Sequence, residues 1–89
     1  MAWKIEIQEN ALKQLSKLGK QDAKRILGFL KERLGTHDDP RKIGSALQGS
    51  RLGNFWRYRV GDYRIICDLQ DEKLIVLVIE IGHRREVYR

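Results

Sequence analysis

The chain has 89 residues, which is the size of one domain and leaves no room for a second. Hydrophobic residues make up 42% of it and charged residues 34%, a balance that excludes a disordered or membrane-spanning protein. The longest apolar run, Leu74–Ile79, is far shorter than the roughly 20 residues of a transmembrane helix, and no signal peptide is visible. We therefore expect a single cytoplasmic domain over residues 1–89.

The net charge is +6, from 18 Lys/Arg against 12 Asp/Glu, and the arginines are unevenly placed. Residues 1–40 contain two arginines among eight basic residues, whereas residues 41–89 contain eight among ten. The planar fork of arginine suits bidentate contact with phosphate better than the point charge of lysine does. The second half therefore predicts a polyanion-binding surface, the alternative being a basic surface that only keeps the protein soluble.

Cysteine and histidine are too few for the usual cross-links. Cys67 is the single cysteine and the chain has two histidines, so neither an internal disulfide nor a zinc site of ordinary spacing is expected. Cys67 lies among apolar strand residues and is predicted to be a small core residue rather than a nucleophile. We expect neither a metal nor a cofactor.

The first half of the chain predicts a strand and a helical hairpin. Trp3–Ile7 alternates apolar and polar residues, as a half-buried strand does. Apolar residues then recur at three- and four-residue spacing over 11–18 and 22–34, which is typical of two amphipathic helices. Gly19 is predicted to end the first helix in a left-handed conformation, and Gly35 to end the second.

The second half predicts a long loop and three strands. Thr36–Gly53 contains Pro40 and several glycines and is expected to be irregular, with room for one helical turn. The strands are predicted over three ranges: Phe55–Val60, Tyr63–Leu69 and Leu74–Ile81. Gly61-Asp62 predicts a hairpin turn with glycine first. The last strand is almost entirely apolar, which predicts a central strand covered on both faces, at least in its middle. The expected fold is α+β: an N-terminal strand, a two-helix hairpin, then an antiparallel sheet.

Five residues could form a phosphate clamp. Arg57 and Arg59 lie two apart and share one face of a strand, and Arg64 follows the turn on the partner strand. Arg84 and Tyr88 share a face in the basic tail His83–Arg89. Guanidinium groups can stabilise a phosphorane-like transition state, and a ribose 2′-hydroxyl supplies an internal nucleophile. The alternative is a solvated face whose charge is balanced by three carboxylates, those of Asp62, Asp68 and Glu80.

Several segments together resemble the RelE/ParE toxin superfamily of bacterial toxin–antitoxin modules. They are Leu47-Gln48-Gly49, Trp56–Ile66 with its Gly-Asp-Tyr-Arg turn, Leu74–Ile81, and the ending Gly82–Tyr88 with Arg-Arg-Glu-Val-Tyr. The resemblance implies a compact fold like that of microbial ribonucleases. For the RelE branch it implies a ribosome-dependent endoribonuclease that cleaves mRNA in the A site, inhibits translation and is neutralised by a cognate RelB-like antitoxin.

The same resemblance implies a role for each candidate residue in a metal-independent reaction. Arg57 and Arg59 stand where the family usually has lysines that contact the scissile phosphate. Arg64 matches the arginine that stabilises the transition state, Arg84 the general acid, and Tyr88 the general base. Arginine in place of lysine preserves the charge at 57 and 59 but removes any role in proton transfer.

Both the base and the function have competing candidates. His83 has a suitable reference pKa, near 6.5, but alternation along a strand points it away from Arg84. His37 is expected to be a loop residue. The aromatic residues could stack on bases, but core or structural roles are favoured for Trp3, Trp56, Tyr58 and Tyr63. The competing functions are a ParE-like inhibitor of DNA gyrase and a non-catalytic RNA- or ribosome-binding module.

Overall fold

The computed structural model describes residues 3–36, 39–46 and 55–83, which form five strands and four helical segments. In chain order these are β1 (Lys4–Ile7), α1 (Glu9–Ser16), α2 (Lys20–Gly28), the π-helical turn η1 (Phe29–Leu34), the 3₁₀ turn η2 (Pro40–Ile43), β2 (Ser45–Ala46), β3 (Phe55–Val60), β4 (Tyr63–Gln70) and β5 (Ile75–His83). The predicted strands and the helical turn after residue 36 are confirmed, and the two-residue strand β2 was not predicted.

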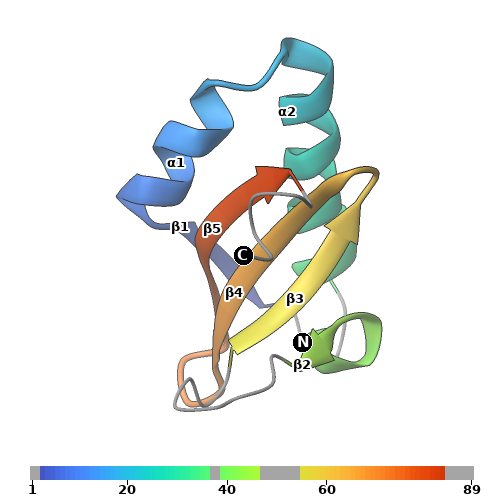
Figure 1. Cartoon of the computed structure of the whole chain (residues 1–89). Coiled ribbons are helices and arrows are strands. Elements are labelled where there is room, and N and C mark those ends of the chain that lie inside the picture. The colour runs from blue at the N-terminus through green and yellow to red at the C-terminus, as the bar shows by residue number, and fades with distance from the viewer. Residues whose placement is uncertain (1–2, 37–38, 47–54, 84–89) are drawn as a thin grey trace.

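The strands form one mixed sheet in the order β1-β5-β4-β3-β2 (Figure 1). All neighbouring pairs are antiparallel except β1 and β5, which are parallel. The helical hairpin and strands β2 to β4 lie between these two in sequence, so the long connection that a parallel pair requires is available. The predicted α+β fold is confirmed, with the N-terminal strand joining the far edge of the antiparallel sheet.

The hydrophobic core lies between the helices and one face of the sheet. The helices contribute Ala11, Leu15, Ile26, Leu30 and Leu34, and the sheet contributes Tyr58, Ile65, Cys67, Leu69, Val76, Val78 and Ile81. These strand residues occur at alternate positions, apart from a register shift at Ile66/Cys67. We call this side of the sheet the helix face.

Helix ends differ in one respect from the prediction. α1 ends at Ser16, whose Oγ donates to the carbonyl of Lys13 at 2.7 Å. Gly19 has an extended backbone and precedes α2, so the left-handed ending predicted there is wrong. Gly35 does follow the second helical stretch, and its carbonyl accepts from the amide of Trp3 at 2.9 Å.

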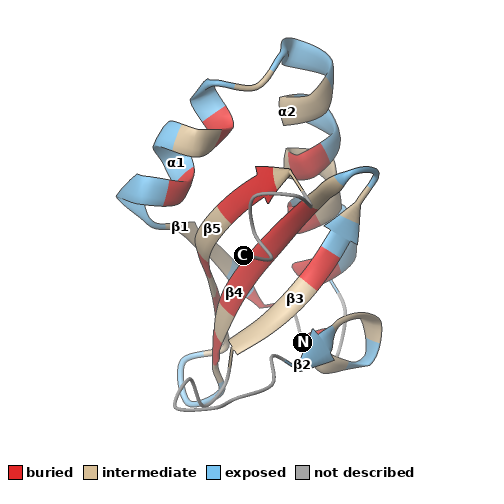
Figure 2. Ribbon diagram, in the orientation of Figure 1, coloured by how far each residue is buried: buried red, intermediate tan, exposed pale blue. Residues whose placement is uncertain are grey.

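The most buried strand is β4 rather than β5. Arg64–Cys67 are four consecutive buried residues at the middle of the five-stranded sheet (Figure 2). β5 is an interior strand, but Ile75, Leu77 and Ile79 are only partly buried. The predicted central position of β5 is confirmed, whereas the prediction that its middle is covered on both faces is wrong. Its apolar composition reflects contacts with two neighbouring strands and the helices on one side.

The β3–β4 turn and the 3₁₀ turn η2 both have well-defined conformations or contacts. Gly61 has a φ of +59°, and Asp62 has no positive φ, which confirms the glycine-first hairpin turn. The Tyr58 hydroxyl donates to the carbonyl of Pro40 at 2.9 Å and so fixes η2 beside β3. Within the described ranges, no helix is long and apolar enough to cross a membrane.

Candidate functional site

Three of the predicted site residues lie on the sheet face opposite the helices. Arg59 is directly opposite Arg64 in the β3–β4 register, and Arg57 is opposite Ile66. Tyr58, between the two β3 arginines, is buried on the helix face with its ring 6.0 Å from that of Phe29. We call the side that carries Arg57, Arg59 and Arg64 the arginine face.

The three arginines differ in exposure. Arg59 is exposed and Arg57 partly buried, whereas only 6% of Arg64 is exposed. Nη1 of Arg64 lies 3.2 Å from the carbonyl oxygen of Tyr63 and 3.5 Å from that of Gly61, so the guanidinium is folded back onto its own hairpin turn. Gly82, its partner on β5, has no side chain to compete for this space. Arg64 is thus a fixed charge on the strand next to Arg57 and Arg59.

Three carboxylates were candidates to balance the charge of this face. Glu80 is opposite Ile66 on the arginine face, and Asp68 is opposite Phe55 on the same side. In the part of the chain that the structure describes, neither Asp68, Glu80 nor the turn residue Asp62 forms an ion pair. A face balanced by direct pairing with these carboxylates is therefore not observed.

A pocket of about 400 Å³ opens at the sheet edge beside β2. Its lining consists of Phe29, Arg33, Lys42, Ile43, Gly44, Ser45, Arg57 and Arg59. We call it the edge pocket. Four of these described lining residues are cationic and none is acidic, so the pocket has the electrostatic character of an anion site. No sequence pattern singled out Arg33 and Lys42, because they come from η1 and η2, far along the chain from the strand arginines.

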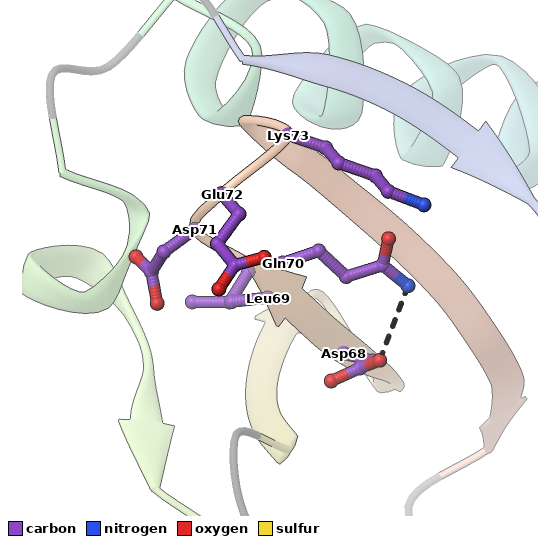
Figure 3. A pocket seen from close by; sticks show the side chains of 6 residues that line it. All are labelled: Asp68, Leu69, Gln70, Asp71, Glu72 and Lys73. Atoms are coloured by element: carbon purple, nitrogen blue, oxygen red, sulfur yellow. Dashed lines mark hydrogen bonds between the residues drawn. The ribbon is translucent and has the colours of Figure 1, made fainter.

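A second cavity has the opposite character. It measures about 390 Å³ and is lined by the residues 68–73 at the β4–β5 turn (Figure 3). Three of these are carboxylates, those of Asp68, Asp71 and Glu72, against the single cation of Lys73. Gln70 Nε2 donates to Asp68 Oδ2 at 3.3 Å. The excess of negative charge makes this cavity unsuitable for phosphate.

One arginine near the edge pocket is already engaged. Arg41 donates through both Nη atoms to the two carboxylate oxygens of Asp71, at 2.8 and 2.5 Å. This contact lowers the pKa of Asp71 and raises the pKa of Arg41. Arg41 also lies 3.8 Å from Asp39 and 5.8 Å from the centre of the Trp56 ring. It therefore acts structurally, joining η2 to the β4–β5 turn.

His83 lies on the helix face. It is opposite Tyr63, whose hydroxyl donates to Asp22 of α2 at 3.1 Å, and the two rings meet edge-on at 6.0 Å. His83 is therefore across the sheet from Arg64, which disfavours it as the base for a phosphate bound on the arginine face.

Structural roles are confirmed for Trp3, Trp56, Tyr58 and Cys67. Trp3 and Cys67 are buried, and Trp56 is partly buried against the core. Burial raises the pKa of the Cys67 thiol, so it is not an activated nucleophile, and burial likewise raises the pKa of Tyr58.

Some predicted site residues lie outside the described part of the chain. These are Arg84 and Tyr88 of the clamp and the loop residue His37, together with residues 47–54. Their predicted roles stay predictions.

Comparison with known proteins decides the family. Residues 5–88 match the family model described as the ParE toxin of the type II toxin–antitoxin system parDE. The chain is also 33% identical to the mRNA interferase toxin RelE of Escherichia coli, over 99% of this chain and 92% of that protein. The chain belongs to the RelE/ParE toxin superfamily.

Solved structures agree with this RelE/ParE assignment. The fold matches the toxin–antitoxin complex RelBE2 from Mycobacterium tuberculosis with a TM-score of 0.83 at 22% identity, covering 97% of this chain and 95% of that one. It also matches the isolated E. coli RelE toxin with a TM-score of 0.73 at 28% identity, covering 98% and 92%. The observed mixed sheet and helical hairpin are thus those of RelE toxins.

Proposed function

We propose that this RelE/ParE member is a ribosome-dependent endoribonuclease that cleaves mRNA in the A site and is neutralised by an antitoxin. The observation that carries the proposal is the arginine face, where three guanidinium-bearing residues share one side of adjoining strands. The curated relatives that align over nearly the whole chain are named mRNA interferases. The protein would act as one domain in the cytoplasm.

The proposed reaction needs only side chains, water and the RNA itself. The ribose 2′-oxygen attacks the adjacent phosphorus and loses its proton, while the 5′-oxygen leaves and gains one. Arg57 and Arg59 would bind the phosphate, and Arg64 would stabilise the charge that develops on its oxygens. Tyr88 would accept the proton from the 2′-hydroxyl. Arg84 would take the general-acid position that the family resemblance implies, where its guanidinium donates a hydrogen bond to the leaving 5′-oxygen while water supplies the proton.

Pre-organisation gives Arg64 its proposed role. A guanidinium held by main-chain carbonyls, with 6% of the residue exposed, need not be reordered when charge develops in the transition state. The exposed Arg59 is better suited to initial capture of the phosphate. Direct opposition of Arg59 and Arg64 makes their mutual repulsion greatest when no anion is bound.

The proposed partners are programmed ribosomes and an acidic antitoxin. The M. tuberculosis RelBE2 and E. coli RelBE structures are toxin–antitoxin complexes, which supports an antitoxin partner for this chain. A partly disordered, acidic antitoxin that folds over the basic surface would combine charge complementarity with an amphipathic segment.

A second function competes with the nuclease because the matching family model bears the ParE name. A ParE-like toxin would inhibit DNA gyrase without cleaving RNA. The two functions make different demands on the arginine face: cleavage requires a charge fixed at the scissile phosphate, whereas gyrase inhibition requires no phosphoryl chemistry.

The deciding experiment combines primer extension on mRNA from cells expressing the protein with a gyrase supercoiling assay. We expect new mRNA ends within translated codons, lost in the double variant Arg57→Gln/Arg59→Gln and kept in Lys20→Gln/Lys24→Gln. The second pair removes the same charge from the exposed side of α2. Inhibition of supercoiling without new mRNA ends would refute the nuclease and support the ParE-like function.

A further inference from the structure

The edge pocket contains two cations that the proposed reaction does not use. Arg33 is exposed at the end of η1 and Lys42 is exposed on η2. Both line the pocket together with Arg57 and Arg59 of β3. The same two strand arginines therefore belong to the arginine face and to the edge pocket, which makes the two sites continuous around the sheet edge.

The described lining of the pocket includes no acidic side chain. No carboxylate is part of it, and in the described ranges neither Arg33, Lys42 nor Arg59 forms an ion pair. Asp39, which precedes η2, contacts Arg41 at 3.8 Å. The like charges of Arg33, Lys42 and Arg59 around one hollow repel one another unless an anion lies among them.

The walls of the pocket are fixed by packing. The Gly44 position would place a Cβ 2.5 Å from the Tyr58 ring, so only glycine lets the chain follow this path beside β3. The Arg33 guanidinium lies 5.8 Å from the centre of the Phe29 ring, and that ring packs against Tyr58. The segments that carry the two cations are thus both anchored at the same buried tyrosine, η1 through Phe29 and η2 through Pro40.

The size and composition favour a nucleotide phosphate over a peptide. A volume of about 400 Å³ lies within the range of roughly 300–1,000 Å³ for small-molecule sites. Among the described lining residues, Phe29 and Ile43 are the only large apolar ones, too few for the apolar groove that an amphipathic helix needs. Arginine is the residue best matched to a phosphodiester.

We propose that the edge pocket binds a phosphodiester of RNA through Arg33 and Lys42, beside the phosphate on the arginine face. This inference rests on the proposed RNA-directed function and extends it to a second binding position. Arg33 and Lys42 are binding residues in this view, with no part in proton transfer. The phosphodiester could belong to the cleaved mRNA or to ribosomal RNA, and the two sources are separated by experiment.

The test uses the full chain and the double variant Arg33→Gln/Lys42→Gln. The control is Lys20→Gln/Lys24→Gln, which removes two exposed charges from α2, outside the pocket. The first probe is a short single-stranded RNA with 2′-O-methyl groups, which cannot be cleaved, so binding is measured independently of any nuclease activity. Equal melting temperatures establish that both variants fold.

We expect the pocket variant to bind this RNA about tenfold more weakly. The slope of log affinity against log salt concentration should become shallower by about 0.7, the value for one phosphate of a single strand. The control should keep the wild-type slope. On programmed ribosomes, the same variant should need more toxin for half-maximal cleavage but reach the wild-type maximal rate.

The remaining outcomes are equally decisive. Unchanged oligonucleotide binding with weaker association to ribosomes would support a phosphodiester site and assign it to ribosomal RNA. Equal losses in the pocket variant and the control would overturn the proposal, since they would reflect net charge alone. The proposal would also be overturned if the pocket variant bound both the oligonucleotide and the ribosome as the wild type does. The same holds if the variant lost affinity only for an acidic antitoxin. Absence of cleavage by the wild type would refute the nuclease while leaving the binding measurements interpretable.

Discussion

Arg64→Met offers a sharp test of the fixed guanidinium, because methionine fills much of the same space without the charge. The substitution removes the contacts from Nη1 to the carbonyls of Gly61 and Tyr63. Hydrogen bonds from charged groups are worth about 1.5–3 kcal/mol each. The substitution also removes two costs of the wild-type arginine. These are the desolvation of a buried charge, about several kcal/mol, and the repulsion between Arg64 and the opposite Arg59.

These opposing effects should nearly cancel in the free energy of unfolding. We expect a change within about 1 kcal/mol, or a melting temperature within about 4–8 °C of the wild type. Cleavage should respond differently, because a pre-organised donor is worth about 1.4–4 kcal/mol in the transition state. Single-turnover cleavage on programmed ribosomes should therefore slow about ten- to 1,000-fold.

The measurement compares rates at equal concentrations of folded protein. Lys24→Met is the control, since Lys24 is exposed on α2 and its loss removes one charge without touching the arginine face. A rate for Arg64→Met equal to that of the wild type would refute the reasoning that a buried, carbonyl-bound guanidinium stabilises the transition state. A drop in melting temperature large enough to leave the protein unfolded would show that Arg64 instead holds the turn.

Three further predictions concern proton transfer, packing and pH. Tyr88→Phe should slow single-turnover cleavage about 10²–10⁴-fold and His83→Gln only slightly, and the reverse ranking would make His83 the base. Gly28→Ala should raise the free energy of unfolding by about 0.5–1 kcal/mol in thermal melts, because the added methyl group meets nothing within 4 Å. Gly44→Ala should lower it by about 1–3 kcal/mol, because the added methyl group overlaps the Tyr58 ring. Asp71→Asn should cost only a few tenths of a kcal/mol at neutral pH, as expected for an exposed ion pair. The contact with Arg41 lowers the pKa of Asp71 in the folded protein. The stability that Asp71 contributes is therefore complete above the ordinary carboxyl pKa near 3.9 and is lost as the pH falls through the pKa of the folded state. The melting temperatures of the wild type and Asp71→Asn should converge in acid.

The strand and turn residues were predictable because their signals are local. Alternation placed Arg57 and Arg59 on one side of β3 and Tyr58 on the other, and the pairing across Gly61-Asp62 brought Arg64 opposite Arg59. A two-residue turn fixes this register, so the arginine face follows from the sequence alone.

What sequence could not supply were the long-range contacts. The burial of Arg64 depends on carbonyls of its own turn and on Gly82 of another strand, and the edge pocket joins Arg33 to residues of β3. Gly19 failed as a helix ending because α1 ends earlier, at Ser16, and Gly19 has the extended backbone of the residue that precedes α2. Periodicity reports which face a residue occupies, whereas these features depend on which segments meet.

The parallel pairing of β1 with β5 links the two ends of the described chain. Among the described strands, β5 is the one neighbour of β1, and its other edge pairs with β4 (Figure 1). A nascent chain that stops before residue 75 therefore has the β3 and β4 arginines but lacks the strand that joins their hairpin to the rest of the sheet. Such distant pairings form late because the intervening chain must first be closed into a loop. The complete sheet that supports the arginine face therefore cannot assemble until the residues of β5 have left the ribosome.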